Sequence, residues 1–110
     1  MEHADREIPA PQQVTADGVR YAEAANARMR GFAQSGGVII ATDIETGKEL
    51  WVLQVYTAKF DAAEERDMQE TFITALEVST DGRHLQVTNE DGARFSVDLQ
   101  TRAVTPVSAR

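Results

Sequence analysis

Five turn signals at regular places along the chain constrain its fold more than any other feature. They are Asp17-Gly18, Gly36-Gly37, Thr46-Gly47, Asp81-Gly82 and Asp91-Gly92. An Asp-Gly pair between apolar segments is the strongest local signal for a tight hairpin, because aspartate tolerates the left-handed backbone region and glycine readily adopts it. Four of these five sites precede a strand-like segment. The punctuation therefore predicts an antiparallel meander.

The segments between the turns give an all-β fold of six or seven short strands. We expect them at residues 19–24, 38–44, 49–59, 71–79, 83–89 and 93–99, with a seventh at 103–106. In 93–99, Phe95, Val97 and Leu99 alternate with polar residues, which predicts one buried face and one solvated face. Both faces of 49–59 carry apolar residues, so we expect that strand to be interior and covered on both sides.

Two segments have helical character. Residues 61–70 begin with Asp61 and place Glu64 three positions later, the spacing of a capping box, so a short helical connection is expected near 61–70. The alanine-rich stretch 21–30 also suits a helix, and an α+β fold with a helix at 21–30 is the alternative. We favour a strand followed by a loop there, because isolated helices of this length are only marginally stable.

Length and charge narrow the class of protein further. The chain has 110 residues, consistent with one domain at 14–107 preceded by a flexible tail at 1–13. Its formal charge of −7 argues against nucleic acid or an anionic membrane as a partner. We expect no secretory signal, because the first residues are charged, and the longest aliphatic run, Val38 to Ala41, is far too short to cross a bilayer. We expect a cytoplasmic location.

Residues suited to catalysis or to cofactor binding are sparse. There is no cysteine, which removes disulfides, thiolate metal sites and thiol nucleophiles, and the two histidines are His3 in the tail and His84 on a polar strand face. Glu77 and Asp98 on neighbouring strands could form a carboxylate pair for sugar hydrolysis, but pairing with nearby arginines is the better interpretation. We therefore expect no catalytic, cofactor-binding or metal-binding residues, no cofactor, and no enzyme activity.

One dense acidic run remains as a candidate partner surface. Its carboxylates are Asp61, Glu64, Glu65, Asp67 and Glu70. Oxygen ligands suit calcium or magnesium, but the run lacks the alternate-residue aspartates and central glycine of a calcium loop. A solvated helix or connection is the simpler interpretation, and contact with a basic partner is the functional one.

The segment Ala41-Thr42-Asp43-Ile44-Glu45-Thr46-Gly47-Lys48-Glu49-Leu50-Trp51 resembles the repeat of quinoprotein-type β-propellers. This resemblance covers residues 38–60 and 76–102. Closing a propeller needs at least about 160 residues, so the chain either associates to complete a ring or builds a single small sheet or barrel. The sequence also resembles a family of short, uncharacterised bacterial proteins over about residues 14–107, which implies a stand-alone bacterial domain and no activity.

These observations predict a small non-enzymatic bacterial domain that binds a protein partner or itself. Exposed strand edges favour association by strand pairing, with another copy or with a segment of another protein. The first alternative is an acidic, immunity-type inhibitor of a basic enzyme. A carboxylate-based hydrolase is the third hypothesis.

Overall fold

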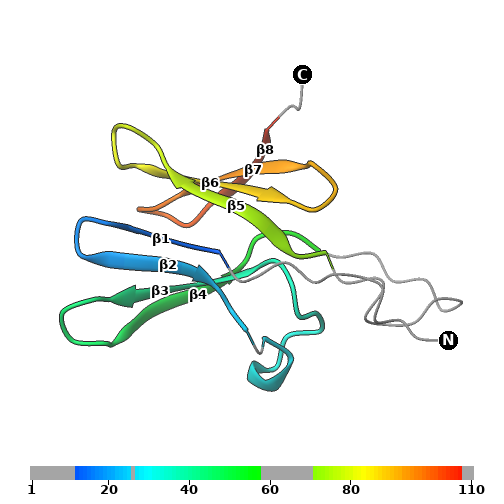
Figure 1. Ribbon diagram of the computed structural model, residues 1–110, viewed down its shortest axis with the longest axis horizontal. Coiled ribbons are helices and arrows are strands. Elements are labelled where there is room, and N and C mark those ends of the chain that lie inside the picture. Colours follow the sequence, from blue (N-terminus) through cyan, green and yellow to red (C-terminus); the bar gives the residue numbers. More distant parts are fainter. Residues whose placement is uncertain (1–11, 26, 58–70, 108–110) are drawn as a thin grey trace, which may run out of the picture.

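The computed structural model describes residues 12–25, 27–57 and 71–107, which form two four-stranded antiparallel sheets (Figure 1). Sheet A runs in the order β1 (Gln13–Ala16), β2 (Val19–Glu23), β3 (Val38–Asp43) and β4 (Glu49–Gln54). Sheet B runs in the order β5 (Ile73–Val78), β6 (His84–Asn89), β7 (Arg94–Asp98) and β8 (Val104–Val107). A 3-10 turn, η2, spans Ala27–Arg30. The predicted all-β antiparallel fold is confirmed.

Three details differ from the expectations or lie beyond them. The described residues contain eight strands rather than six or seven, because residues 13–16 pair with β2 across the Asp17-Gly18 turn. The segment 21–30 is a strand end followed by a 3-10 turn, so the alternative with a helix there is wrong. The helical connection expected near 61–70 falls outside the described residues.

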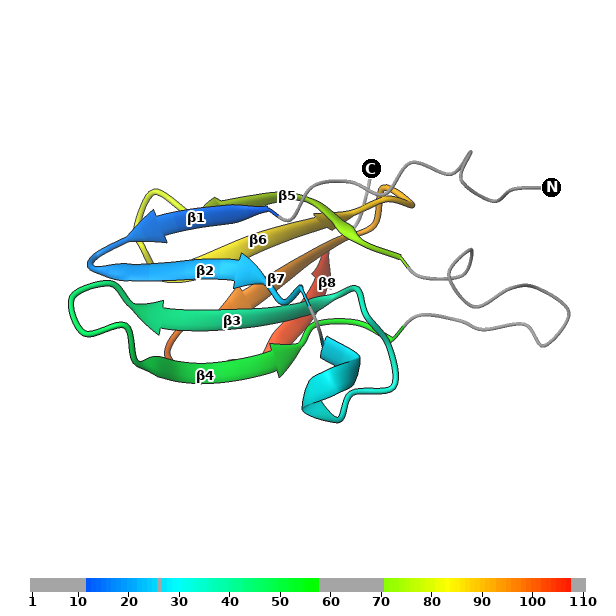
Figure 2. The same cartoon turned by 60° about the horizontal axis from the view of Figure 1, so that its bottom comes forward.

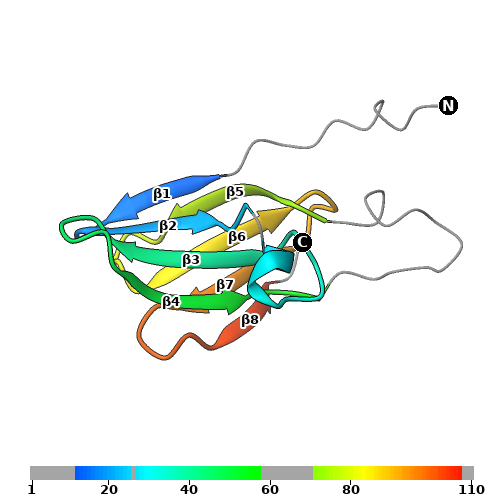
Figure 3. The same cartoon turned by 90° about the horizontal axis from the view of Figure 1, so that it is seen from below.

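The two sheets pack against each other around one core cluster. Its buried members are Tyr21, Ile39, Ala41, Val55, Ile73, Leu85, Val87 and Val97. They alternate with outward-facing residues along their strands, as a half-buried pleated surface requires. Strands β1 and β5 lie side by side at one rim of the stack, whereas β4 and β8 lie at the opposite rim (Figures 2 and 3).

The two outer faces of this stack are built differently. On the outer face of sheet A, Val38, Ala24 and Ala27 form a small second cluster with partly buried Ile40 and Val52, and η2 lies over it (Figure 3). The outer face of sheet B instead carries polar residues on its central strands, namely His84, Gln86, Thr88, Arg94, Ser96 and Asp98. Among the described residues, the apolar cluster on sheet A is covered by η2 and the central strands of sheet B are polar on their outer face, which disfavours stacking of a further sheet.

The last hairpin of each sheet has the same turn. In sheet A, the Gly47 N–H donates to the Asp43 carbonyl (2.8 Å) and the Asp43 N–H donates to the Lys48 carbonyl (2.8 Å). In sheet B, the Arg102 N–H donates to the Asp98 carbonyl (2.6 Å), with the matching bond from Asp98 to Ala103. The residue in the left-handed region is Gly47 in one turn (φ 77°) and Arg102 in the other (φ 67°).

Because the turns match, positions in β3 and β7 can be compared directly. Ala41 lies two residues before the turn aspartate Asp43 and is buried in the core, whereas Ser96 lies two residues before Asp98 and faces away from it. Equivalent positions thus point inward in sheet A and outward in sheet B. The two sheets therefore turn opposite faces of the same kind of meander toward the core.

Candidate functional site

The acidic run singled out from the sequence is not part of the structure described here. Asp61, Glu64, Glu65, Asp67 and Glu70 all lie outside the described residues. The candidate site is therefore built from the part of the chain that the structure describes.

The carboxylate pair considered for hydrolysis is not brought together as a reactive pair. Glu77 lies on β5 and Asp98 at the end of β7, with β6 between them. The Asp98 carboxylate accepts backbone N–H bonds from Gln100 (2.8 Å) and Thr101 (3.0 Å). These bonds, first that from Thr101, lower the pKa of Asp98, so the group is an ionised turn cap and poorly suited to donate a proton.

Strand edges are another feature with functional potential, and the described strands leave four of them: β1 and β4 in sheet A, β5 and β8 in sheet B. Unpaired edges template association with other strands, and proteins blunt them by covering, charge or proline. Strands β1 and β5 lie side by side, so each shields the other (Figure 2). Strand β8 carries Pro106. Within the described residues, β4 is not covered by another strand and contains no proline. Its one charge, Glu49, and its bulge lie at its beginning, which leaves the edge at Val52 and Gln54 without these protections.

The position of Pro106 matches its chemistry. The Asp98 N–H donates to the Ala103 carbonyl, and the alternation of an antiparallel ladder then directs the backbone groups of Val104 and of residue 106 away from β7. An ordinary residue at 106 would offer an N–H to an incoming strand. Proline has none, so β8 is guarded at that point.

The backbone of β4 presents the opposite situation. The Val55 N–H donates to the Gly37 carbonyl at 2.8 Å, and residues 53 and 51 follow in register opposite Ile39 and Ala41. The same alternation therefore directs the N–H and C=O groups of Val52 and Gln54 away from β3. Gln54 thus occupies in β4 the kind of position that Pro106 occupies in β8. The expectation that this strand is interior is wrong, since β4 is an edge strand among the described residues.

The side chains of β4 explain why its sequence suggests an interior strand. Trp51 and Leu53 pack against the main core, and Val52 packs on the other face against the cluster beneath η2. Both faces are apolar because one meets sheet B and the other meets η2, while no described strand pairs with the edge itself. Side-chain periodicity reports covered faces and contains no information about open edges.

The Trp51 ring lies at the rim between two other residues. Its centroid is 5.9 Å from that of Tyr21, and the Arg102 guanidinium carbon lies 6.0 Å from the ring centroid. Arg102 reaches across from the last turn of sheet B, so this cation–π contact joins the two sheets beside the open edge.

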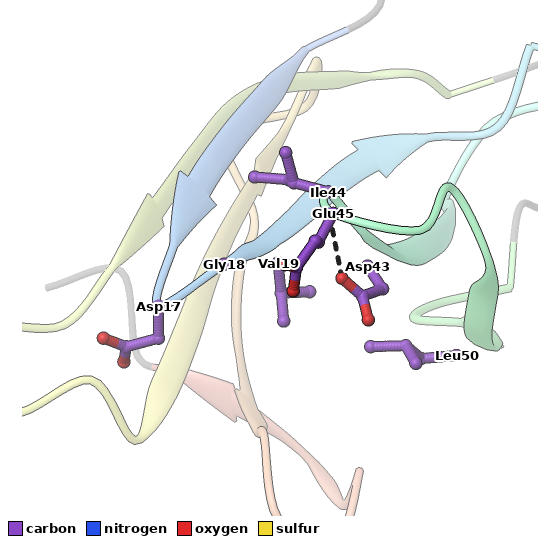
Figure 4. A pocket seen from close by; sticks show the side chains of 7 residues that line it. All are labelled: Asp17, Gly18, Val19, Asp43, Ile44, Glu45 and Leu50. Atoms are coloured by element: carbon purple, nitrogen blue, oxygen red, sulfur yellow. Dashed lines mark hydrogen bonds between the residues drawn. The ribbon is translucent and has the colours of Figure 1, made fainter.

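A shallow pocket of about 380 Å³ lies at the beginning of β4, between the β1–β2 and β3–β4 turns. In Figure 4, the Asp43 and Glu45 carboxylates lie near Val19 and Leu50, while Asp17 and Ile44 point away. Leu50 is the extra residue of a β-bulge opposite Ala41 and Thr42, and it is 48% exposed. The bulge displaces an apolar side chain into solvent next to two acids.

Sequence reasoning missed a buried acid on β2. Glu23 is 6% exposed, and its Oε2 accepts N–H bonds from Gly37 (3.0 Å) and from Ile73 of sheet B (2.9 Å). Burial raises the pKa of Glu23 more than these two bonds lower it, and the Glu90 charge raises it slightly further. The carboxylate ties the two sheets together. Its only sequence signal is a glutamate in phase with Val19 and Tyr21, the inward-facing residues of its strand.

The described residues contain no cluster of three or more His, Cys, Asp or Glu side chains placed to hold a metal ion. No helix among them is long and apolar enough to cross a membrane. No protein-family model, curated protein or solved structure matches this chain.

Proposed function

We propose that this chain is a non-enzymatic protein-interaction domain that binds by adding a strand of another chain to the edge of β4. The observation that carries the proposal is the contrast among the four edges: in the described residues, β1 and β5 cover each other and β8 carries Pro106, whereas β4 has outward backbone groups with neither cover nor proline. Strand addition takes its affinity from main-chain hydrogen bonds and its specificity from alternate side chains.

Leu50 and the neighbouring acids support the same proposal. An added strand would lie along Val52 and Gln54 and would reach the pocket at the start of β4, where Leu50 is exposed beside Asp43 and Glu45. Ordinary surface leucines are common, but here the exposed side chain adjoins an unpaired strand edge. The polar outer face of sheet B argues against the alternative in which copies stack into a closed propeller ring.

The experiment introduces into β4 a proline at an outward-facing backbone position, as β8 already has. Gln54→Pro removes an N–H that points out of the sheet and so leaves the bonds to β3 intact. Gln54→Ala is the matched control, because both changes remove the side-chain bond to Thr57 Oγ1 and only proline removes the N–H. Both variants are presented to a phage-displayed library of random dodecapeptides.

We expect clones that bind the wild-type chain and Gln54→Ala and that lose binding to Gln54→Pro. The peptides of these clones should alternate apolar and polar residues, as expected of an extended strand. Equal enrichment on the alanine and proline variants would contradict strand addition at β4.

Inhibition of a basic enzyme is a second candidate function, favoured by the net charge of −7 and by the Asp43 and Glu45 carboxylates in the pocket. The same library separates the two functions. Clones rich in Lys and Arg that depend on Glu45, tested with Glu45→Lys, and that bind Gln54→Pro normally would favour the inhibitor. Clones that bind Glu45→Lys normally and lose binding to Gln54→Pro favour strand addition.

A further inference from the structure

The sequence of β4 is close to self-complementary about its centre. Leu50, Trp51, Val52, Leu53 and Gln54 place a large apolar residue on each side of the central valine. In an interface between two identical copies around a two-fold axis, residue i of one copy contacts residue j of the other and the reverse, so the strand must complement itself. The apolar residues on each side of Val52 meet this requirement.

We propose that the strand added to β4 is β4 of a second copy of this chain, paired antiparallel with Val52 opposite Val52 of that copy. The inference rests on the proposed function and deepens it by naming the occupant and the register. The two A sheets would then form one continuous antiparallel sheet across the two-fold axis.

The backbone geometry fits this register. The N–H and C=O groups of Val52 and Gln54 point away from β3, so the two central valines exchange a pair of hydrogen bonds in the dimer. The N–H of Gln54 faces the Leu50 region of the other copy, and the symmetric contact forms at the other end. A shift of this register by one residue would place the outward backbone groups of Val52 opposite Trp51 or Leu53 of the second copy. The backbone groups of those two residues already bond to β3.

The side chains fit as well. Trp51 stands opposite Leu53 of the second copy on the face that already packs on the core, which extends the apolar surface under both sheets. On the other face the two Val52 side chains meet between the η2 clusters.

Charge is compatible with this register. Glu49 is the only charged residue of β4, and it faces Val55 of the second copy. Its carboxylate is held by Arg30 of its own chain, with Arg30 Nη1 donating to Glu49 Oε1 at 3.1 Å. No like charges oppose each other in the paired strands. Since each copy carries −7 overall, repulsion between copies predicts that added salt strengthens the dimer.

A cysteine cross-link tests the register directly. The chain contains no cysteine, so Val52→Cys introduces a single thiol. Opposed residues of a hydrogen-bonded antiparallel pair have Cα atoms about 5.5 Å apart, within the range that a disulfide spans. Thr105→Cys, on the exposed part of β8 beside Pro106, is the matched control. We expect mild oxidation to yield covalent dimers from Val52→Cys and monomers from Thr105→Cys. Equal yields would overturn the register.

Sedimentation equilibrium of the cysteine-free chain avoids any effect of Val52→Cys on folding. We expect wild type and Gln54→Ala to dimerise with similar dissociation constants. Two N–H groups per dimer are lost in Gln54→Pro, so its dimer should be weaker by on the order of tenfold or more.

A wild-type chain that stays monomeric at about millimolar concentration would overturn the inference. In that case, library peptides that still distinguish Gln54→Pro from Gln54→Ala would leave strand addition to β4 standing. Peptides that fail to distinguish the two variants would remove the proposed function as well.

Discussion

Strands β4 and β8 are the last strands of two meanders and are entered through the same turn, yet one is an open edge and the other is guarded. Both strands have backbone positions that face away from their sheet. In β4 these positions, Val52 and Gln54, keep their N–H groups, whereas in β8 Pro106, which corresponds to Val52 when counted from the turn, has none. Proline at such a position costs the sheet no hydrogen bond. Two edges with the same topology can therefore have opposite capacities for association, and the difference is set by backbone chemistry rather than by hydrophobicity.

The first prediction tests the difference between β4 and β8 by removing the side chain that anchors β4. Trp51 packs on the core and contacts Tyr21 and Arg102, whereas β8 contributes only the smaller Val104 to the same rim. We expect Trp51→Ala to lower the free energy of unfolding by about 3 kcal/mol, at the lower end for a partly buried tryptophan, and Val104→Ala by about 1 kcal/mol. Urea denaturation measures both. Equal losses would show that the two edge strands anchor the sheets alike.

The second prediction uses the buried acid that only sheet A contributes. Because the pKa of Glu23 is raised in the folded state, folding takes up a proton. Its contribution to stability is complete below the unfolded pKa, about 4.3, and is lost as pH rises through the folded pKa. The free energy of unfolding of wild type should therefore fall relative to that of Glu23→Gln over this window, by at most about 1.4 kcal/mol per pH unit.

The measurement is chemical denaturation of both proteins at a series of pH values from 4 upward. The difference between them isolates Glu23, since the turn aspartates with lowered pKa values, Asp81 and Asp98, are common to both. A constant difference across the series would contradict the raised pKa of Glu23.

A third test exchanges the residues in the left-handed positions of the matching turns. A Cβ at Gly47 would meet no other atom, so Gly47→Ala should cost only the backbone term, about 1 kcal/mol. Arg102→Gly relieves the same strain but loses the contact with Trp51 and loosens the unfolded chain, so its net change should stay within about 0.5 kcal/mol. Thermal or urea unfolding of the pair decides whether the turns are equivalent.

The fourth prediction opens the guarded edge. Pro106→Gln gives β8 the outward N–H that Gln54 provides in β4, with little effect expected on stability. We expect the variant to gain a second association mode, seen as species larger than a dimer in light scattering. Unchanged size distributions would show that Pro106 is not what protects β8.

The turns and the strands between them were predictable because both depend on local chemistry. Asp17-Gly18 and Asp81-Gly82 each form the expected tight connection, and the alternation of Phe95 and Val97 with polar residues gives the orientation of β7. Residues 13–16 lacked a strong apolar pattern, and their strand is recognisable only through its pairing with β2.

The candidate site was less accessible to sequence reasoning. Trp51, Val52 and Leu53 pack on two different covers, so the pattern of an edge strand was indistinguishable from that of an interior one. The importance of Gln54 depends on which way its N–H points, which follows from register and not from residue type. The role of Glu23 depends on a bond to Ile73, which lies fifty residues away.

Amide hydrogen exchange along β4, followed as a function of protein concentration, tests the central claim most directly. The N–H groups of Trp51 and Leu53 bond to β3 and should be protected at every concentration, whereas those of Val52 and Gln54 should become protected only as the dimer forms. Protection of Val52 and Gln54 that does not change with concentration, whether present or absent throughout, would contradict pairing of β4 with a second copy.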